Sequence, residues 1–369
     1  MASGPPMPTR SAPGPRQGGG GRATARQPVD VAIMRGGTSR GPVLRLDAAP
    51  PAGPVRDLFA RALIGETPVD GLGGGTPITN KVVLVGPGAG GGAQLDYIVG
   101  NVSPTGGVVD WSGTCGNMTA AVVPFAAIAG LLGSAPESQQ LFRLRNLATG
   151  GLVDVTVDEP GGLGADGGEV RLTTAYLDPG GSVLGATLPT GRPREVVDVD
   201  GEGVVCTIID VTHPYLLLDY EQVVGGGSVD DPGLLERIER IRGTVCVMLG
   251  LCRDADAARG VSAAVPRVVL VHAKPGSDAD VRITAVSMGR AIATVPVTAA
   301  MSLAAAHRID GTLVSGEACD CGDDYDDVVC VAAPAASLEA RVRVDSSGRV
   351  RSAAVGRTAR CVLRGTAWA

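Results

Sequence analysis

Apolar residues occur along this chain in short runs that are separated by segments rich in glycine and proline. Such runs, with frequent β-branched residues, predict strands at 31–34, 43–46, 81–85, 108–111 and 267–271. Apolar residues at helical spacing predict helices at 54–63 and 234–249. A continuous apolar stretch predicts another helix, which starts after Cys115 and ends at Leu132. Because this stretch is apolar on all sides and too short to span a bilayer, we expect it to lie in the centre of a domain.

The composition supports a strand-rich globular protein of two domains. Glycine and proline account for 55 and 26 of the 369 residues, which implies many tight turns. Only 3% of the residues are aromatic, so Val, Leu, Ile and Ala must fill the cores. The length suits two domains of ordinary size. The net charge of −6 disfavours a nucleic-acid partner, and no segment has the pattern of a membrane span or a signal peptide.

The first 28 residues differ from the rest of the chain. They contain four arginines, no acidic residue and no apolar run, and we interpret them as a flexible tail. The eight cysteines of the whole chain lack the spacing of a disulfide framework, and most of them lie in apolar runs. We therefore expect reduced, buried thiols and a cytoplasmic location.

Lysine is almost absent from the chain. Only two of the 32 basic residues are lysines, Lys81 and Lys274. Arginine keeps its proton at any working pH, whereas a lysine amine can exchange its proton when the environment allows it. Lys274 lies in an Ala-Lys-Pro-Gly sequence that is typical of a turn. Lys81 stands where a glycine-rich loop enters a buried strand, and it is therefore a candidate for proton transfer.

Two turns carry further polar groups. Arg35, Gly36, Gly37, Thr38 and Ser39 follow the first predicted strand, and they form either a cradle for a carboxylate or a plain hairpin turn. The glycine-rich segment 70–75 is not a phosphate loop, because no Gly-Lys-Ser/Thr follows and the next element is a strand.

Cys115 precedes the apolar helix. Free backbone N–H groups at a helix N-terminus favour a thiolate and bind anions, so this cysteine is a candidate for acid–base chemistry. A small, buried capping cysteine is the alternative interpretation.

Several motifs occur in order along nearly the whole chain after the tail. They are Met34-Arg35-Gly36-Gly37-Thr38-Ser39, Asp70-Gly71-Leu72-Gly73-Gly74, Thr79-Asn80-Lys81-Val82, Gly113-Thr114-Cys115-Gly116-Asn117-Met118, Leu188-Pro189-Thr190-Gly191, Val286-Ser287-Met288-Gly289 and Arg357-Thr358-Ala359-Arg360. Together these motifs resemble those of the PrpF family, which includes 2-methylaconitate isomerase, 3-methylitaconate Δ-isomerase and 4-oxalomesaconate tautomerase. This family is part of the diaminopimelate-epimerase-like superfamily.

The resemblance implies an α+β fold of two similar domains, at 29–188 and 189–369, after a tail at 1–28. Each domain would be a bent, mixed β-sheet wrapped around a central helix, with the active site in the cleft between the domains. The two central helices would be Met118 to Leu132 and Ala299 to His307.

The resemblance also implies an acid–base pair, Lys81 and Cys115. In the second half Thr298 stands where a racemase of this kind would need a second thiol. A 1,3-proton shift in an unsaturated di- or tricarboxylic acid is therefore expected, without a metal or an organic cofactor. Oligomeric state stays open, with a homodimer as one option. The expected substrate-binding residues are Arg35, Thr38, Ser39, Thr79, Gly116, Asn117, Met118, Ser287, Met288 and Gly289.

The chain departs from the family pattern in its second half. The family commonly has a His shortly after Ser-Met-Gly-Lys, where this chain continues Gly289-Arg290-Ala291-Ile292, and His-Pro-Ser-Gly where this chain has 333–336. His213-Pro214 replaces the usual Asn-Pro. We therefore expect the part of the site that binds the end of the substrate to be altered. A substrate with fewer carboxylates, or a bulkier one from specialised metabolism, would fit. Two alternatives remain: a different proton transfer, such as cyclisation or hydration, and a non-catalytic carboxylate-binding protein.

Two polar features are interpreted as structural. The acidic segment from Cys319 to Asp327 lacks the ligand spacing of a zinc or calcium site, so we expect a solvated loop. His307 is expected to interact with the C-terminal end of its helix rather than to act as a catalyst.

Overall fold

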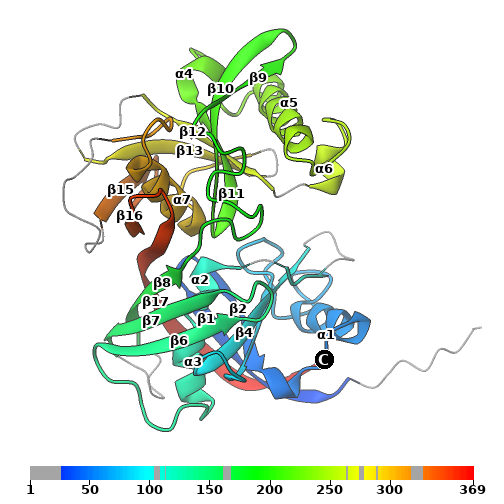
Figure 1. Cartoon of the computed structure of the whole chain (residues 1–369). Coiled ribbons are helices and arrows are strands. Elements are labelled where there is room, and N and C mark those ends of the chain that lie inside the picture. Colours follow the sequence, from blue (N-terminus) through cyan, green and yellow to red (C-terminus); the bar gives the residue numbers. More distant parts are fainter. Residues whose placement is uncertain are drawn as a thin grey trace, which may run out of the picture.

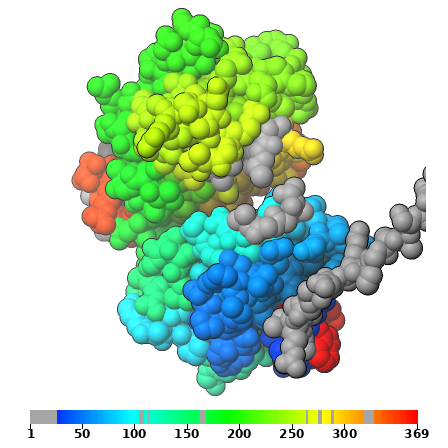
Figure 2. All heavy atoms as spheres, turned by 90° about the vertical axis from the view of Figure 1, so that its right-hand side faces the viewer, coloured from blue at the N-terminus to red at the C-terminus, as the bar shows by residue number. Residues whose placement is uncertain are grey.

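The computed structural model describes residues 26–103, 109–112, 114–160, 168–262, 265–273, 278–287, 290–316 and 327–369. Within these residues the strands are hydrogen-bonded into one mixed network of 17 strands. Figure 1 shows two lobes, one built mainly from the first half of the chain and the other from the second half. Figure 2 shows the same two lobes stacked on each other when the molecule is turned by 90°.

The described residues of the first half form eight strands and four helices. The strands are β1 (Pro28–Gly36), β2 (Ser39–Arg45), β3 (Lys81–Pro87), β4 (Leu95–Val102), β5 (Val109–Asp110), β6 (Gln140–Asn146), β7 (Leu152–Glu159) and β8 (Val170–Leu177). The helices are the 3-10 helix η1 (Leu46–Ala48), α1 (Pro54–Ile64), α2 (Gly116–Thr119) and α3 (Val122–Ile128). Most neighbouring strands are antiparallel, whereas β2–β3 and β4–β6 are parallel. The strands predicted at 31–34, 43–46 and 81–85 and the helix at 54–63 are therefore confirmed.

Both faces of the β2–β3 pair are covered. Val43 and Val83 pack in the cluster that contains α2 and α3, whereas Leu44 and Val82 pack with α1 on the opposite face. Side chains alternate between the faces of a strand, so a strand that is covered on both sides has an uninterrupted apolar sequence. This explains why these strands are apolar runs rather than alternating patterns.

In the second half, the part of the chain that the structure describes forms nine strands and four helices. The strands are β9 (Glu195–Val199), β10 (Glu202–Val211), β11 (His213–Asp219), β12 (Arg267–Val271), β13 (Val281–Ser287), β14 (Arg290–Ile292), β15 (Asp327–Ala333), β16 (Ala336–Val344) and β17 (Val350–Trp368). The helices are α4 (Tyr220–Val223), α5 (Pro232–Met248), α6 (Ala258–Val261) and α7 (Val297–Arg308). The helices predicted at 234–249 and at 299–307 and the strand at 267–271 are confirmed, with α7 starting two residues early and ending one residue late.

Two helices cover opposite faces of the second-half strands. Ile238 and Ile241 of α5 pack against Leu216 and Leu270 on one face. On the other face, α7 is buried at every position from 297 to 306, and many of these residues are alanines. Small side chains around the whole helix let the strands approach it closely, as expected for a central helix.

The expected first central helix is wrong in its extent. It is divided into α2 and α3 at Ala120 and Ala121, and it ends at Ile128 instead of Leu132. Pro124 has no N–H to donate to the carbonyl of Ala120, and its ring crowds that carbonyl, so a continuous helix is disfavoured there. Gly130, with φ of 67°, then ends α3, because a glycine adopts this left-handed conformation without strain.

Strand β17 returns from the second half to the first. It pairs with β16 at its beginning, and then with β8 and with β1. At its far end Trp368 lies opposite Pro28, and the backbone N–H of Gln27 donates to the carbonyl of Ala369 at 2.7 Å. Gln27 and Pro28 therefore belong to the sheet rather than to the predicted tail. The domain boundary at 188–189 stays a prediction, although the end of β17 completes the first-half sheet.

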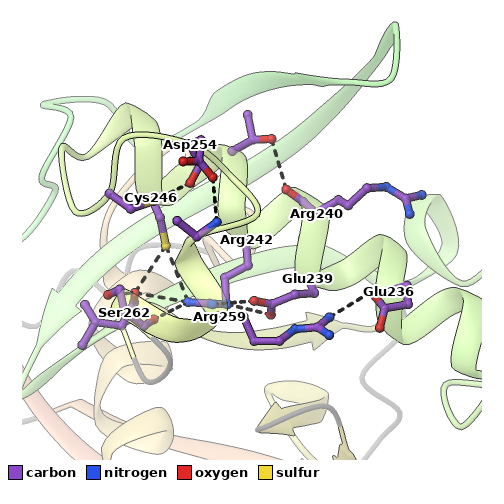
Figure 3. Close-up of polar contacts among 12 residues, drawn as sticks. Glu236, Glu239, Arg240, Arg242, Cys246, Asp254, Arg259 and Ser262 are labelled. Carbon is purple, nitrogen blue, oxygen red and sulfur yellow. Dashed lines mark hydrogen bonds and ion pairs between the residues drawn. The ribbon is translucent and has the colours of Figure 1, made fainter.

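A buried arginine connects α5 to the segment before β12 (Figure 3). The Arg242 guanidinium forms an ion pair with Glu239, and its Nη1 donates to the carbonyl of Ser262 at 2.6 Å and contacts Sγ of Cys246 at 3.5 Å. Burial raises the pKa of the Cys246 thiol to about 11. This cysteine therefore stays protonated at neutral pH, and the cluster serves to hold α5 in place.

Candidate active site

Lys81 begins β3 and lies on the sheet face that packs against α2 and α3. Val83 and Val85, which share this face by the alternation of side chains in a strand, belong to the same core cluster as α2 and α3. Nζ of Lys81 donates a hydrogen bond to Oδ1 of Asn101, its cross-strand neighbour, at 2.7 Å. The next residue in this row, Asp110, accepts hydrogen bonds from Ser112. Among the described residues, no carboxylate lies within ion-pair distance of Lys81.

Cys115 lies immediately before α2, at its N-cap position. Its carbonyl accepts a hydrogen bond from the N–H of Thr119 at 2.9 Å, so its backbone starts the helical pattern. Its thiol is half-buried and forms no disulfide. Cys206 and Cys246 are also free thiols and are buried, whereas Cys252, Cys330 and Cys361 are half-buried. The expectation of buried thiols thus holds for two of the six described cysteines.

The β1–β2 hairpin meets α2 through Asn117. The Nδ2 atom of Asn117 donates to Oγ1 of Thr38 at 2.9 Å and to Oγ of Ser39 at 3.5 Å. A Cβ atom on Gly36 would collide with the carbonyl oxygen of Asn117, and one on Gly37 would collide with its side-chain amide. The two glycines are therefore required for this close approach, and the structure brings Thr38, Ser39 and Asn117 together.

Other expected site residues are placed differently. The side chain of Met118 is completely buried in the core, so only its backbone is suitably placed for a ligand. The hydroxyl of Thr79 bonds that of Thr76 at 2.8 Å within its own loop. The backbone of Ser287 ends β13 and pairs with Arg290. Met288 and Gly289 lie outside the described residues, so no structural statement applies to them.

The guanidinium of Arg35 is occupied by protein groups. Its Nη1 donates to the carbonyl of Gly37 at 2.9 Å and to Oγ1 of Thr358 at 3.0 Å, and its Nη2 forms an ion pair with Glu169. Gly36, the next residue of the strand, faces Asn117. Adjacent residues of a strand point to opposite faces, so the side chain of Arg35 leaves the sheet on the side away from α2. The structure therefore does not bring Arg35 to the Lys81 face.

A network of buried hydroxyl groups lies behind Cys115, and the sequence reasoning missed it. The hydroxyl of Thr119 bonds those of Tyr97 and Tyr176, each at 3.2 Å. Tyr97 accepts from Thr119 and Tyr176 donates to it. Burial raises the pKa of both tyrosines above the ordinary value of 10.0, so both keep their phenolic protons at neutral pH. Oη of Tyr176 lies 3.5 Å from the position of a Cβ on Gly116. The spacing of these residues in the sequence gave no signal of their proximity.

Arg357 of β17 was also not predicted as a residue of the site. It lines a cavity of about 480 Å³ together with Arg35, Gly37, Thr38, Asp158, Arg171, Leu172, Gly356 and Thr358. A Cβ on Gly37 would collide with the side chain of Asn117 and would lie 3.2 Å from Cδ of Arg357. The side chains of Asn117 and Arg357 therefore both lie next to Gly37. The cavity thus opens next to the contact between Thr38 and Asn117.

The N-terminal ends of α2 and α7 meet. A Cβ on Gly116 would lie 2.8 Å from Cγ1 of Val297, the first residue of α7. The next residue, Thr298, is buried, and its Oγ1 lies 2.7 Å from Oη of Tyr215. Thr298, which the resemblance matches to Cys115, is therefore engaged with a tyrosine, and the ring of His213 contacts that tyrosine edge-on.

Three further polar features of the sequence are His307, the acidic segment that starts at Cys319, and Lys274. His307 occupies the last turn of α7, where its Nδ1 lies 2.8 Å from the carbonyl oxygen of Val314. The predicted acidic loop from Cys319 lies outside the described residues up to 326, as does Lys274. In the described part of the chain, no group of three or more His, Cys, Asp or Glu residues could hold a metal ion. No helix there has the length and apolarity needed to cross a membrane.

Comparison with known proteins adds to this geometry. The PrpF protein family model matches residues 26–369. The 3-methylitaconate isomerase of Eubacterium barkeri is 30% identical, covering 91% of this chain and 96% of the relative. The (4E)-oxalomesaconate Delta-isomerase of Novosphingobium sp. (strain KA1) is also 30% identical, with coverages of 90% and 95%. A crystal structure of a methylitaconate-delta-isomerase superimposes with a TM-score of 0.77 at 29% identity, covering 94% of this chain and 96% of that one.

Proposed function

The chain belongs to the PrpF family, and from this premise we propose that it is an isomerase that moves a double bond in an unsaturated di- or tricarboxylic acid by a 1,3-proton shift. Relatives named as isomerases of 3-methylitaconate, 2-methyl-aconitate and oxalomesaconate support this class of substrate. The observation that carries the proposal is the environment of Lys81. Its amine is half-buried, is held by a neutral amide, and lies on the sheet face that leads to Cys115.

Lys81 is proposed to remove the first proton. A general base needs a lone pair directed at the substrate and a partner that fixes its orientation. The amide oxygen of Asn101 fixes the amine without adding a negative charge, which would bind the ammonium form more tightly. Proton removal from the carbon next to the double bond then gives a dienolate, whose negative charge spreads onto a carboxylate or carbonyl oxygen.

The negative charge of the dienolate needs hydrogen-bond donors that are already in place. Thr38 and Ser39 offer hydroxyl groups, and the amide of Asn117 holds them beside the start of α2. Tyr176, kept neutral by its burial, lies behind Gly116. Fixed donors of this kind stabilise a developing oxyanion because they need no reorientation during the reaction.

The last step returns a proton to the distal carbon. Two groups are suited to it: the thiol of Cys115, and the amine of Lys81, which would then carry one proton from one carbon to the other. Both groups belong to the protein, so the proposed reaction uses neither a metal nor an organic cofactor. Thr298, bonded to Tyr215, offers no second thiol, which argues against a racemase that places one thiol on each face of a carbon.

We further propose that the reaction takes place between two epimerase-like domains, at 29–188 and 189–369. The meeting of α2 with α7 supports this arrangement, because it brings one helix end from each half to the same place. Substrate reaching Cys115 would then be exposed to groups of both halves.

The experiment that tests the proposal is a substrate panel. Purified protein, treated with a chelator and dialysed, is incubated with 3-methylitaconate, 2-methylaconitate and 4-oxalomesaconate, and double-bond migration is followed by proton NMR. We expect turnover of at least one of these acids or of a close analogue. The absence of turnover across a wider panel of unsaturated di- and tricarboxylic acids, with saturable binding retained, would favour a carboxylate-binding protein instead.

A further inference from the structure

The cavity at the end of the β1–β2 hairpin contains three arginines that differ in their partners. Arg35 is paired with Glu169, and Arg171 is paired with Glu159 at 3.4 Å. Arg357 has no acidic partner within ion-pair distance among the residues that the structure describes. The charge of a half-buried guanidinium without a carboxylate loses solvation and gains no compensating ion pair.

The hydrogen bonds of Arg357 leave most of its donors free. Within the described part of the chain, Nη1 donates to the carbonyl of Gly356 at 3.0 Å, and the buried Nε has no partner. Burial lowers the pKa of this arginine, which reflects the same unfavourable desolvation. A carboxylate accepts hydrogen bonds from two donors of a guanidinium at once. A carboxylate ligand in this cavity would therefore both pair the free N–H groups of Arg357 and compensate its buried charge.

The register of β17 directs Arg357 toward the Lys81 side of the sheet. Arg357 lies opposite Leu172 of β8, which is fully buried in the main core, so the two side chains share the inner face. Thr358, the next residue, is the one that bonds Arg35 on the outer face. Gly37 lies between Cδ of Arg357 and the side chain of Asn117, which places Arg357 beside the start of α2.

From these contacts we infer that Arg357 binds a carboxylate group of the substrate, in the cavity beside Thr38 and Asn117. This inference rests on the proposed function and adds a specificity determinant to it. One carboxylate held by Arg357 fixes the substrate at the hairpin end of the site, while the reacting carbons lie toward Lys81 and Cys115. The enzyme should therefore prefer substrates whose non-reacting carboxylate is ionised and unesterified.

The test compares Arg357→Gln and Arg357→Lys with a control, Arg360→Gln. Arg360 is exposed and lies on the outer face opposite Arg35, so its loss leaves the cavity unchanged. Removing a charge-assisted hydrogen bond typically costs about ten- to hundredfold in affinity. For a dicarboxylate that the wild type isomerises, we expect KM to rise by this factor in Arg357→Gln, with a smaller change in kcat. The Arg357→Lys variant should recover part of the loss, and Arg360→Gln should match the wild type.

A second readout separates this inference from the proposed function. Malonate should raise the melting temperature of the wild type and of Arg360→Gln, and this rise should be lost in Arg357→Gln. If the wild type turns over its substrate and Arg357→Gln keeps both the same KM and the same malonate response, the inference is overturned while the function stands. If no acid is turned over but the malonate response still depends on Arg357, the carboxylate site is supported and the isomerase function is not. Should Arg357→Gln fail to fold, Arg357→Lys together with a monomethyl ester of the substrate gives the same comparison.

Discussion

Lys81 and Asn101 face each other across β3 and β4, and the amine donates a 2.7 Å hydrogen bond to the amide oxygen. The partner of this lysine is neutral, which distinguishes it from Arg143, Arg145, Arg237 and Arg242, whose partners are Asp or Glu. A neutral partner orients the amine without holding its proton. The first two predictions follow from this pair.

Replacing the amine should abolish turnover. Lys81→Arg keeps the positive charge, but a guanidinium does not release its proton at any working pH. We expect kcat to fall by two or more orders of magnitude, roughly the contribution of one acid–base catalyst. Circular dichroism and the melting temperature should remain close to those of the wild type. Substantial activity in Lys81→Arg would contradict the assignment of the base.

Changing the partner should change the pH dependence instead. Asn101→Asp introduces a carboxylate at the same position, which would stabilise the ammonium form of Lys81. The acidic limb of the pH–rate profile should therefore move to higher pH by about one unit or more. Asn101→Ala serves as the control, because it removes the hydrogen bond without adding a charge. Equal profiles for Asn101→Asp and the wild type would show that Lys81 is not the titrating base.

The role of Cys115 can be followed with isotopes. Cys115→Ser keeps the size of the side chain but replaces the thiol by a much weaker acid, so kcat should fall more than KM changes. In D₂O the wild-type product should carry deuterium at the carbon that gains hydrogen if the thiol delivers the proton. Transfer of the original hydrogen, observed by NMR as an unlabelled product, would assign both steps to Lys81.

Gly37 should be sensitive to the smallest side chain. Its φ of 48° is left-handed, and an added Cβ would collide with Asn117 and press on Arg357. We expect Gly37→Ala to lower the free energy of unfolding by roughly 1–2 kcal/mol and to reduce activity further by displacing Asn117. Gly365→Ala in β17, where a Cβ meets nothing within 4 Å, is the matched control. Unfolding in urea measures the first effect and steady-state kinetics the second.

The buried tyrosines predict a loss of stability in alkali. Burial raises the pKa of Tyr97 and Tyr176 in the folded protein above the ordinary 10.0 that the unfolded chain retains. Below pH 10 both states hold the phenolic protons, so the contribution to stability is fully present. Above it the unfolded chain loses protons first, and stability falls by up to about 1.4 kcal/mol per pH unit for each tyrosine. Tyr176→Phe should show a shallower decline in urea titrations between pH 9.5 and 11, and an unchanged slope would contradict this account.

Local sequence patterns were sufficient for much of the scaffold. Strand β12 was predicted from a short continuous apolar run. Helices α1 and α5 were predicted because their apolar residues recur at helical spacing. The family motifs named Thr38, Ser39 and Asn117 as candidates for substrate binding, and their contact with one another became visible only in the structure. The break between α2 and α3 was visible only as a single residue, Pro124, within a strongly apolar stretch. Its effect on the backbone outweighed the continuous hydrophobicity that suggested one long helix.

The assignment of arginines depended on information that local sequence does not contain. Arg35 lies in a conspicuous Arg-Gly-Gly-Thr-Ser motif, yet its side chain points away from α2, whereas Arg357 points toward it. The face that each side chain occupies is fixed by the register between β1, β17 and β8, and Arg35 and Thr358 are 323 residues apart. A shift of one residue in β1 or in β17 would move the arginine of that strand to the opposite face of the sheet.

Strand β17 also has a consequence for biosynthesis. Until residues 350–368 have emerged from the ribosome, β1 and β8 both lack their neighbour, and each exposes an unpaired edge. The first lobe is therefore translated early, but its sheet is complete only when β17 has paired with β1 and β8. Until then its nascent strands must be kept from pairing with other chains. Truncation before residue 350 would thus remove the strand that pairs with β1 and β8, and it would destabilise the first lobe as well as the C-terminal strand itself.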